Sequence, residues 1–137
     1  NRRLVEHWGE LGEQGRTRTH RVKFFGSLEK QVDGLLSVPR QAGYGELDVS
    51  DHSVLLVEYA IDGDGTEDDV DKRHALEDLL NETLGWTGLG YCDGGSVGSG
   101  TMEAVCFVVD VDLAKSVIAD ALQDTPFEDY SRIYQED

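Results

Sequence analysis

The 137-residue chain carries 12 Lys and Arg against 28 Asp and Glu, which gives a formal net charge of −16 at pH 7. Its hydrophobic content of 39% and its two prolines indicate a chain that can bury a core, which excludes a disordered or linker-rich protein. No apolar run approaches the roughly 20 residues that cross a bilayer, so the sequence predicts no membrane partner.

The charge is divided unevenly along the chain. Residues 1–48 hold eight Lys and Arg against seven Asp and Glu, a net charge of +1. Residues 49–137 hold four against 21, a net charge of −17. This asymmetry predicts two modules with different partners, and the acidic module is expected to repel nucleic acid.

The cysteine content is low. Cys92 and Cys106 are too few for a disulfide scaffold or a zinc site of their own. Both lie among apolar or aromatic neighbours, which predicts reduced thiols that fill space in a cytoplasmic protein.

The first module is predicted to fold as strand, turn, strand, helix, strand. Residues 4–8 and 16–25 are expected to be extended, with glycines between them at the reversal. Ser27 is a candidate N-cap for a helix over residues 28–38 that Pro39 ends. Residues 42–49 are expected to resume an extended conformation.

The second module begins with a predicted buried strand over residues 54–61, because its residues are β-branched and apolar. The acidic segment 62–69 is expected to turn and to suit a helix N-terminus. Apolar residues at helical spacing then predict a helix over 69–84 that Gly85 stops.

Two more extended runs follow at residues 86–93 and 101–110, joined by the glycine-rich hairpin 94–100. A second amphipathic helix is predicted over 111–122, and residues 130–135 are able to close the sheet. The resulting order, βαββαβ, is that of a ferredoxin-like domain over residues 52–137.

No catalytic or metal-binding pattern stands out. An EF-hand loop counted from Asp62 has Glu67 where glycine is required and Arg73 where a bidentate glutamate is required. Residues 93–101 lack the lysine of a phosphate-binding P-loop. The four histidines are scattered without ligand or triad spacing, so we expect no enzyme, no cofactor and no metal.

The first 48 residues contain a set of glycines and aromatics at particular spacing: Trp8-Gly9, Leu11-Gly12, Gly15-Arg16-Thr17, a strand ending at Phe24, the helix over 27–38, and Gly43-Tyr44. In these features the segment resembles a WGR domain, a module of DNA-dependent poly(ADP-ribose) polymerases and of many bacterial proteins. The resemblance implies an antiparallel sheet with one helix and contact with DNA.

The chain departs from the WGR pattern in three ways. Glu10 stands at the position of the arginine that contributes to DNA contact in the family, and it reverses the charge beside a prospective phosphate. The chain begins after the family's usual first strand, which implies a truncated module. Nothing resembles a catalytic ADP-ribosyl transferase domain.

The residues of the segment still permit a DNA-facing surface. Arg16, Arg18 and His20 are expected on one face of a strand, and Arg21 and Lys23 on the other. Val22, Phe24 and Phe25 are expected to enter the core beyond this strand. The predicted DNA-binding residues are Trp8, Arg16, Arg18, Arg21 and Lys23, with Trp8 stacking on an exposed sugar or base.

An alternative interpretation of the same residues is purely structural. Trp8 is then a core anchor, and the arginines pair with Glu6, Glu10 and Glu13. The sequence by itself leaves both interpretations open.

Together these features predict an α+β protein: a WGR-like module at residues 1–48, then an acidic ferredoxin-like domain, with a defined relative orientation across a short linker. The leading functional hypothesis is a non-catalytic DNA-binding module that recognises duplex ends or nicks. The alternative is an acidic interaction, immunity or DNA-mimic protein that binds a basic partner and no nucleic acid. A small-molecule sensor or enzyme that uses the glycine-rich hairpin has the least support.

Overall fold

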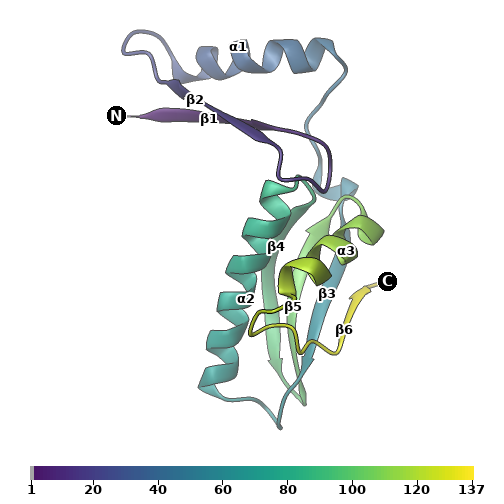
Figure 1. The fold of residues 1–137 in the computed structure, drawn as a ribbon. Coiled ribbons are helices and arrows are strands. Elements are labelled where there is room, and N and C mark those ends of the chain that lie inside the picture. The colour runs from purple at the N-terminus through teal and green to yellow at the C-terminus, as the bar shows by residue number, and fades with distance from the viewer. Residues whose placement is uncertain (1) are drawn as a thin grey trace.

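Backbone pairing divides the strands into two separate antiparallel sheets, one of two strands and one of four. The structure, a computed structural model, describes residues 2–137 and has an α+β fold with three α-helices. The two sheets lie in different lobes (Figure 1), which we call the N-terminal lobe (residues 2–48) and the C-terminal lobe (residues 49–137). Among residues 2–137, no helix is long and apolar enough to span a bilayer.

The N-terminal lobe is a β-hairpin and a helix. Strands β1 (Arg3–Trp8) and β2 (Arg16–Arg21) pair antiparallel, which confirms both predicted strands, with β1 one residue longer at its start than predicted. Helix α1 (Leu28–Gln41) begins after Ser27, whose hydroxyl accepts the Lys30 amide at 3.1 Å. The predicted N-cap is thus confirmed, and α1 lies above the hairpin in Figure 1.

Three predictions for this lobe are wrong. Strand β2 ends at Arg21 rather than at Phe25. Pro39 lies inside α1, because its ring fixes a helical φ and removes only one amide donor near the helix end. Residues 42–48 form no strand, so the sheet of this lobe has two strands only, followed by the short 3₁₀ turn η1 (Val49–Asp51).

The N-terminal lobe has no apolar interior. None of residues 2–48 is buried. Phe24 and Phe25 were expected in the core, yet their side chains are 95% and 88% exposed and contact each other edge to face. A hairpin and one helix bring no second apolar layer to this loop, so these rings have nothing to pack against.

The C-terminal lobe has the predicted order of elements, βαββαβ. Its elements are β3 (Ser53–Ala60), α2 (Glu67–Trp86), β4 (Gly90–Gly98), β5 (Thr101–Val108), α3 (Val111–Leu122) and β6 (Arg132–Gln135). The strands are antiparallel and lie in the order β4-β5-β3-β6. The first and last strands of the lobe, β3 and β6, are therefore neighbours.

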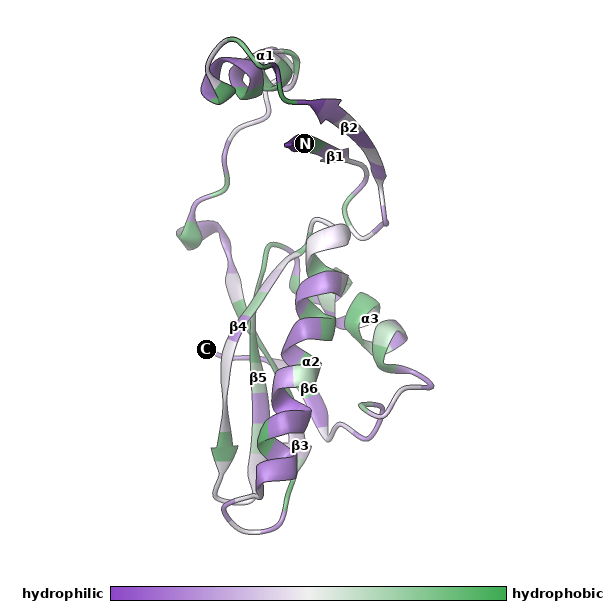
Figure 2. Ribbon diagram, turned by 90° about the vertical axis from the view of Figure 1, so that its left-hand side faces the viewer, coloured by the Kyte–Doolittle hydropathy of each residue, from purple (hydrophilic) through white to green (hydrophobic). Residues whose placement is uncertain are grey.

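Strand alternation and helix periodicity build one core in this lobe. Every second residue of β5 is buried, from Met102 to Val108, as the period-2 pattern requires. Leu76, Leu80 and Leu84 of α2 repeat at four-residue spacing and are fully buried in the same cluster, which also includes Ile118 of α3. Figure 2 shows α2 and α3 beside the sheet, with hydrophilic residues on the outer side of α2.

Most strand and helix boundaries in this lobe differ from the predictions by one to five residues, and two of the differences lie at glycines. Helix α2 continues through Gly85 to Trp86, and the left-handed backbone that follows is at Gly88, with φ of 69°. The glycine-rich segment 94–100 is mostly strand β4, and the reversal is confined to Ser99 and Gly100, both with positive φ. The helix therefore ends later than predicted, whereas the hairpin is confirmed with a shorter turn than expected.

The two cysteines are buried free thiols that lie directly opposite each other on β4 and β5. The side-chain hydrogen bond with Cys92 and burial both raise the pKa of the Cys106 thiol. Both effects favour the neutral thiol, in keeping with space-filling side chains.

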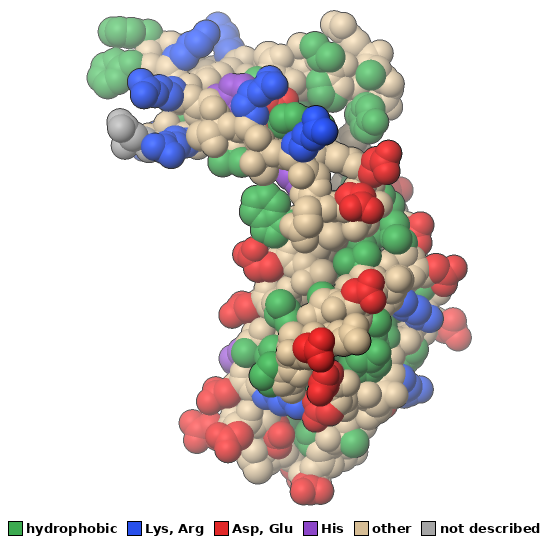
Figure 3. All heavy atoms as spheres, in the orientation of Figure 1, with side chains coloured by type: hydrophobic (Ala, Val, Ile, Leu, Met, Phe, Trp, Pro, Cys, Tyr) green, Lys and Arg blue, Asp and Glu red, His purple; other side chains and the backbone are tan. Residues whose placement is uncertain are grey.

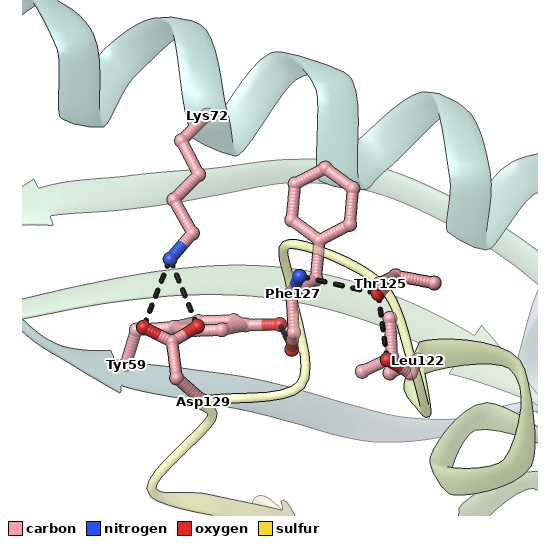
Figure 4. A network of polar contacts seen from close by, with 6 residues as sticks. All are labelled: Tyr59, Lys72, Leu122, Thr125, Phe127 and Asp129. Atoms are coloured by element: carbon pink, nitrogen blue, oxygen red, sulfur yellow. Dashed lines mark hydrogen bonds and ion pairs between the residues drawn. The ribbon is translucent and has the colours of Figure 1, made fainter.

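A polar network fastens the loop between α3 and β6 to the rest of the lobe (Figure 4). The Tyr59 hydroxyl donates to the Phe127 carbonyl at 2.8 Å, and burial raises the pKa of this phenol. Lys72 of α2 lies 4.9 Å from the centre of the Tyr59 ring and 2.9 Å from a carboxylate oxygen of Asp129. This lysine is therefore engaged inside the lobe.

Candidate nucleic-acid interface

The hairpin register sorts its side chains onto two faces. Opposite pairs on one face are Leu4 with His20, Glu6 with Arg18, and Trp8 with Arg16. The other face carries Arg3 opposite Arg21, Val5 opposite Thr19, and His7 opposite Thr17. Both faces of the hairpin therefore carry arginines, as the alternation in the sequence predicts.

Trp8 and Arg18 lie together on the first face. The guanidinium carbon of Arg18 is 5.6 Å from the centre of the Trp8 ring, within cation–π range. The Trp8 side chain is 42% exposed. The expectation that Trp8 anchors a core is therefore wrong, because none of residues 2–48 is buried.

The ion pairs of the hairpin are fewer than the structural interpretation requires. His20 Nε2 lies 2.8 Å from a Glu6 carboxylate oxygen. Within residues 2–137, no arginine or lysine of the hairpin has an ion pair with Glu6, Glu10, Glu13 or any other carboxylate. The side chains concerned are Arg2, Arg3, Arg16, Arg18, Arg21 and Lys23.

Four of these cations surround a hollow at the open end of the hairpin. The hollow has a volume of about 550 Å³ and is lined by Arg2, Arg3, Arg21, Val22, Lys23 and Phe24. The backbone beside it is held by Gln31 of α1, whose side chain donates to the Arg21 carbonyl at 2.9 Å and accepts the Lys23 amide at 3.1 Å. No carboxylate lines the hollow, so its electrostatic potential favours an anion.

Arg2 and Arg3 were missed by the sequence reasoning. The signal was available, because two adjacent arginines lie directly before the predicted first strand and pairing of the two strands places Arg3 opposite Arg21. Both arginines add to the predicted set Trp8, Arg16, Arg18, Arg21 and Lys23, all of which lie in or just beyond the hairpin.

The cations of the C-terminal lobe are engaged differently. Lys72 pairs with Asp129, Arg73 with Glu77 at 2.7 Å, and Arg132 with Glu58 at 3.0 Å. These account for three of the four Lys and Arg of this lobe. Figure 3 shows the consequence, with Lys and Arg gathered on the N-terminal lobe and Asp and Glu spread over the C-terminal lobe.

Among residues 2–137, no three His, Cys, Asp or Glu side chains gather in a way that could hold a metal ion. Comparison of the chain with protein-family models, with curated proteins and with solved structures found no match. The functional argument therefore depends on the geometry and charge of the chain itself.

Proposed function

We propose that the chain is a non-catalytic DNA-binding protein of WGR type, in which the hairpin β1–β2 contacts the phosphate backbone at duplex ends or nicks. The observation that carries the proposal is that the six Lys and Arg side chains of the hairpin have no ion pair within residues 2–137. Cations left free on both faces of a protruding ribbon suit a polyanion, since phosphate contacts supply most of the affinity of such modules.

Trp8 has a second part in this proposal. Its ring is exposed beside Arg16 and Arg18, so a sugar or base at a strand break would meet an aromatic face flanked by cations. Such stacking contributes about 1–3 kcal/mol per base. Intact duplex offers no unstacked base, which is why we infer a preference for ends and nicks.

The C-terminal lobe, which we propose to be ferredoxin-like, limits the DNA contact to the hairpin. Its net charge of −17 repels phosphates, so the duplex is expected to approach from the side of the N-terminal lobe. The lobe then sets the orientation of the approach rather than adding contacts.

The test is fluorescence anisotropy with labelled intact, nicked and blunt-ended duplexes at low and physiological salt. We expect binding that weakens steeply with salt, and the substitution Lys23→Ala to lower the slope of log K against log salt by about 0.9, because one phosphate fewer is neutralised. The charge-matched control is Lys115→Ala on α3, which is expected to leave the slope unchanged. Trp8→Ala should remove the preference for nicked and blunt-ended duplexes.

A flat titration at low salt would overturn this proposal.

A second candidate function is the capture of a basic protein by the C-terminal lobe. It is favoured by the 21 Asp and Glu of this lobe, of which only three occupy its internal ion pairs with Lys72, Arg73 and Arg132. It would then be supported if a lysine-rich peptide bound with strong salt dependence and shifted NMR signals of α2.

A further inference from the structure

A second hollow lies where the two lobes meet. It has a volume of about 700 Å³, within the range of small-ligand sites, and none of the hairpin arginines lines it. Its wall combines apolar and aromatic side chains with two carboxylates, namely Trp8, Tyr44, Leu47, Trp86, Glu10 and Glu13. We call this hollow the junction cleft.

Contacts between the lobes hold the hairpin against the end of α2 at the junction cleft. The Gly12 amide, in the turn of the hairpin, donates to the Thr87 carbonyl just beyond α2 at 2.8 Å. Gly12 has a φ of 89°, and a Cβ there would stand 3.0 Å from a methyl carbon of Leu113, so the turn sits close against α3. His7 meets Trp86 edge to face, with ring centres 5.1 Å apart.

The aromatic rings of the cleft are open to solvent. Trp8, Tyr44 and Trp86 are all exposed, and so is Leu47 beside them. The face of an aromatic ring attracts cations, and indole attracts them most strongly. Trp8 already holds the guanidinium of Arg18 near its ring, which shows that this ring accepts a cation.

No lysine or arginine lines the cleft, although Arg18 lies beside the Trp8 ring. Glu10 and Glu13 line the cleft, and neither has an ion pair within residues 2–137. Helix α2 ends at the cleft with no basic residue in its last turn, so no cationic side chain of this helix offsets the negative end of its dipole. The Trp86 indole nitrogen donates to a Glu82 carboxylate oxygen at 2.8 Å, which adds a third carboxylate next to the rings.

We propose that the junction cleft binds an alkylated ammonium group, carried either by a free quaternary ammonium compound or by a methylated lysine side chain. The rings supply faces for the alkyl groups and the positive charge, and Glu10 and Glu13 complement that charge. A phosphate or a nucleotide is disfavoured by the same carboxylates. The site overlaps the proposed DNA contact at Trp8 and includes none of the lysines and arginines of that contact.

The test uses the chain's own fluorescence. The sequence has two tryptophans, and both line the junction cleft, so in the absence of DNA the intrinsic tryptophan emission reports on ligand binding there. The full chain is titrated with choline and with a short peptide that contains trimethyl-lysine, and calorimetry checks the affinities. The neutral control is 3,3-dimethylbutan-1-ol, which has the shape of choline without its charge.

We expect saturable changes in emission with at least one of the two cations, and the neutral alcohol to bind roughly tenfold more weakly. Saturation by choline alone identifies a free compound as the ligand class, and saturation by the peptide alone identifies a protein side chain. Absence of saturation with both, or equal affinity for the neutral alcohol, would overturn the proposal.

Variants separate this site from the hairpin cations. Glu10→Gln and Glu13→Gln are expected to weaken the cation roughly threefold to tenfold each, with circular dichroism confirming an unchanged fold. The matched control is Glu29→Gln in the first turn of α1, which lies away from the cleft and should leave the affinity unchanged. An equal loss in all three variants would overturn the assignment. DNA anisotropy with the same variants separates the two proposals, because Glu10→Gln removes a negative charge beside the prospective phosphate and is expected to strengthen DNA binding while it weakens cation binding.

Discussion

At the scale of single residues, the Glu58–Arg132 pair makes the stability of the C-terminal lobe depend on pH. Arg132 donates two hydrogen bonds to the two carboxylate oxygens of Glu58, each at 3.0 Å. These hydrogen bonds, opposed by partial burial, hold the pKa of Glu58 below its ordinary value of 4.5. The folded state therefore favours the ionised carboxylate more than the unfolded state does.

The sign of the effect follows from this direction. The pair stabilises the fold above the ordinary Glu pKa of 4.5, and this stabilisation is lost as the pH falls through the lowered pKa. We expect the free energy of unfolding of wild type to exceed that of Glu58→Gln at neutral pH, with the difference shrinking as the pH drops below 4.5. Urea unfolding of both proteins at a series of pH values measures this difference. When Arg132→Ala is also present, the difference in unfolding free energy between Glu58 and Glu58→Gln should no longer change with pH. If the pH dependence persists without Arg132, the ion pair is not its cause.

At the scale of elements, α1 and α2 use their leucines differently. Leu80 of α2 is fully buried, whereas Leu36 of α1 is 39% exposed in a helix without a buried residue. Leu80→Ala is expected to lower the free energy of unfolding by about 2–5 kcal/mol, because the substitution removes buried apolar surface and leaves a cavity. Leu36→Ala should stay within about 0.5 kcal/mol, as for surface positions. Urea unfolding followed by circular dichroism compares them, and an equal cost would indicate a core in the N-terminal lobe.

The same contrast explains how far the sequence predicted the fold. The bounds of α3 were predicted at residues 111–122, because the apolar spacing of this segment and its burial agree. The periodicity of α1 is just as clear, but it shows which face of a helix is apolar and not whether another element covers that face. Phe24 and Phe25 were expected in a core as the end of an extended run, and the two-stranded sheet supplies no core for them.

Part of the candidate interface was predicted from the sequence, because strand alternation is local and strand pairing is not. Alternation within one strand is local, so the faces of Arg16, Arg18 and Arg21 were evident from the sequence. The hollow that adds Arg2 and Arg3 depends on the pairing of two strands. The junction cleft was not predicted at all, since it joins Trp8, Tyr44 and Trp86 across both lobes.

At the scale of the whole molecule, the two lobes differ in burial as well as in charge. The core cluster lies wholly between Leu55 and Leu122, and the N-terminal lobe is held by the hairpin ladder and by the Gly12–Thr87 hydrogen bond. The free energy of local opening is lowest where few apolar contacts must break. The N-terminal lobe is therefore expected to open without unfolding of the C-terminal lobe.

Native-state hydrogen exchange tests this expectation. Amides of β1, β2 and α1 should exchange at least roughly a hundredfold faster than those of β3, β5 and α2, whose side chains form the core. A saturating blunt-ended duplex should slow exchange in the hairpin and leave α2 unchanged, because ligand binding stabilises the segment that it contacts. Lys23→Ala should reduce this slowing, with Lys115→Ala as the control. Uniform protection of both lobes in the free protein would contradict the expectation, because it would mean that the N-terminal lobe unfolds only together with the core.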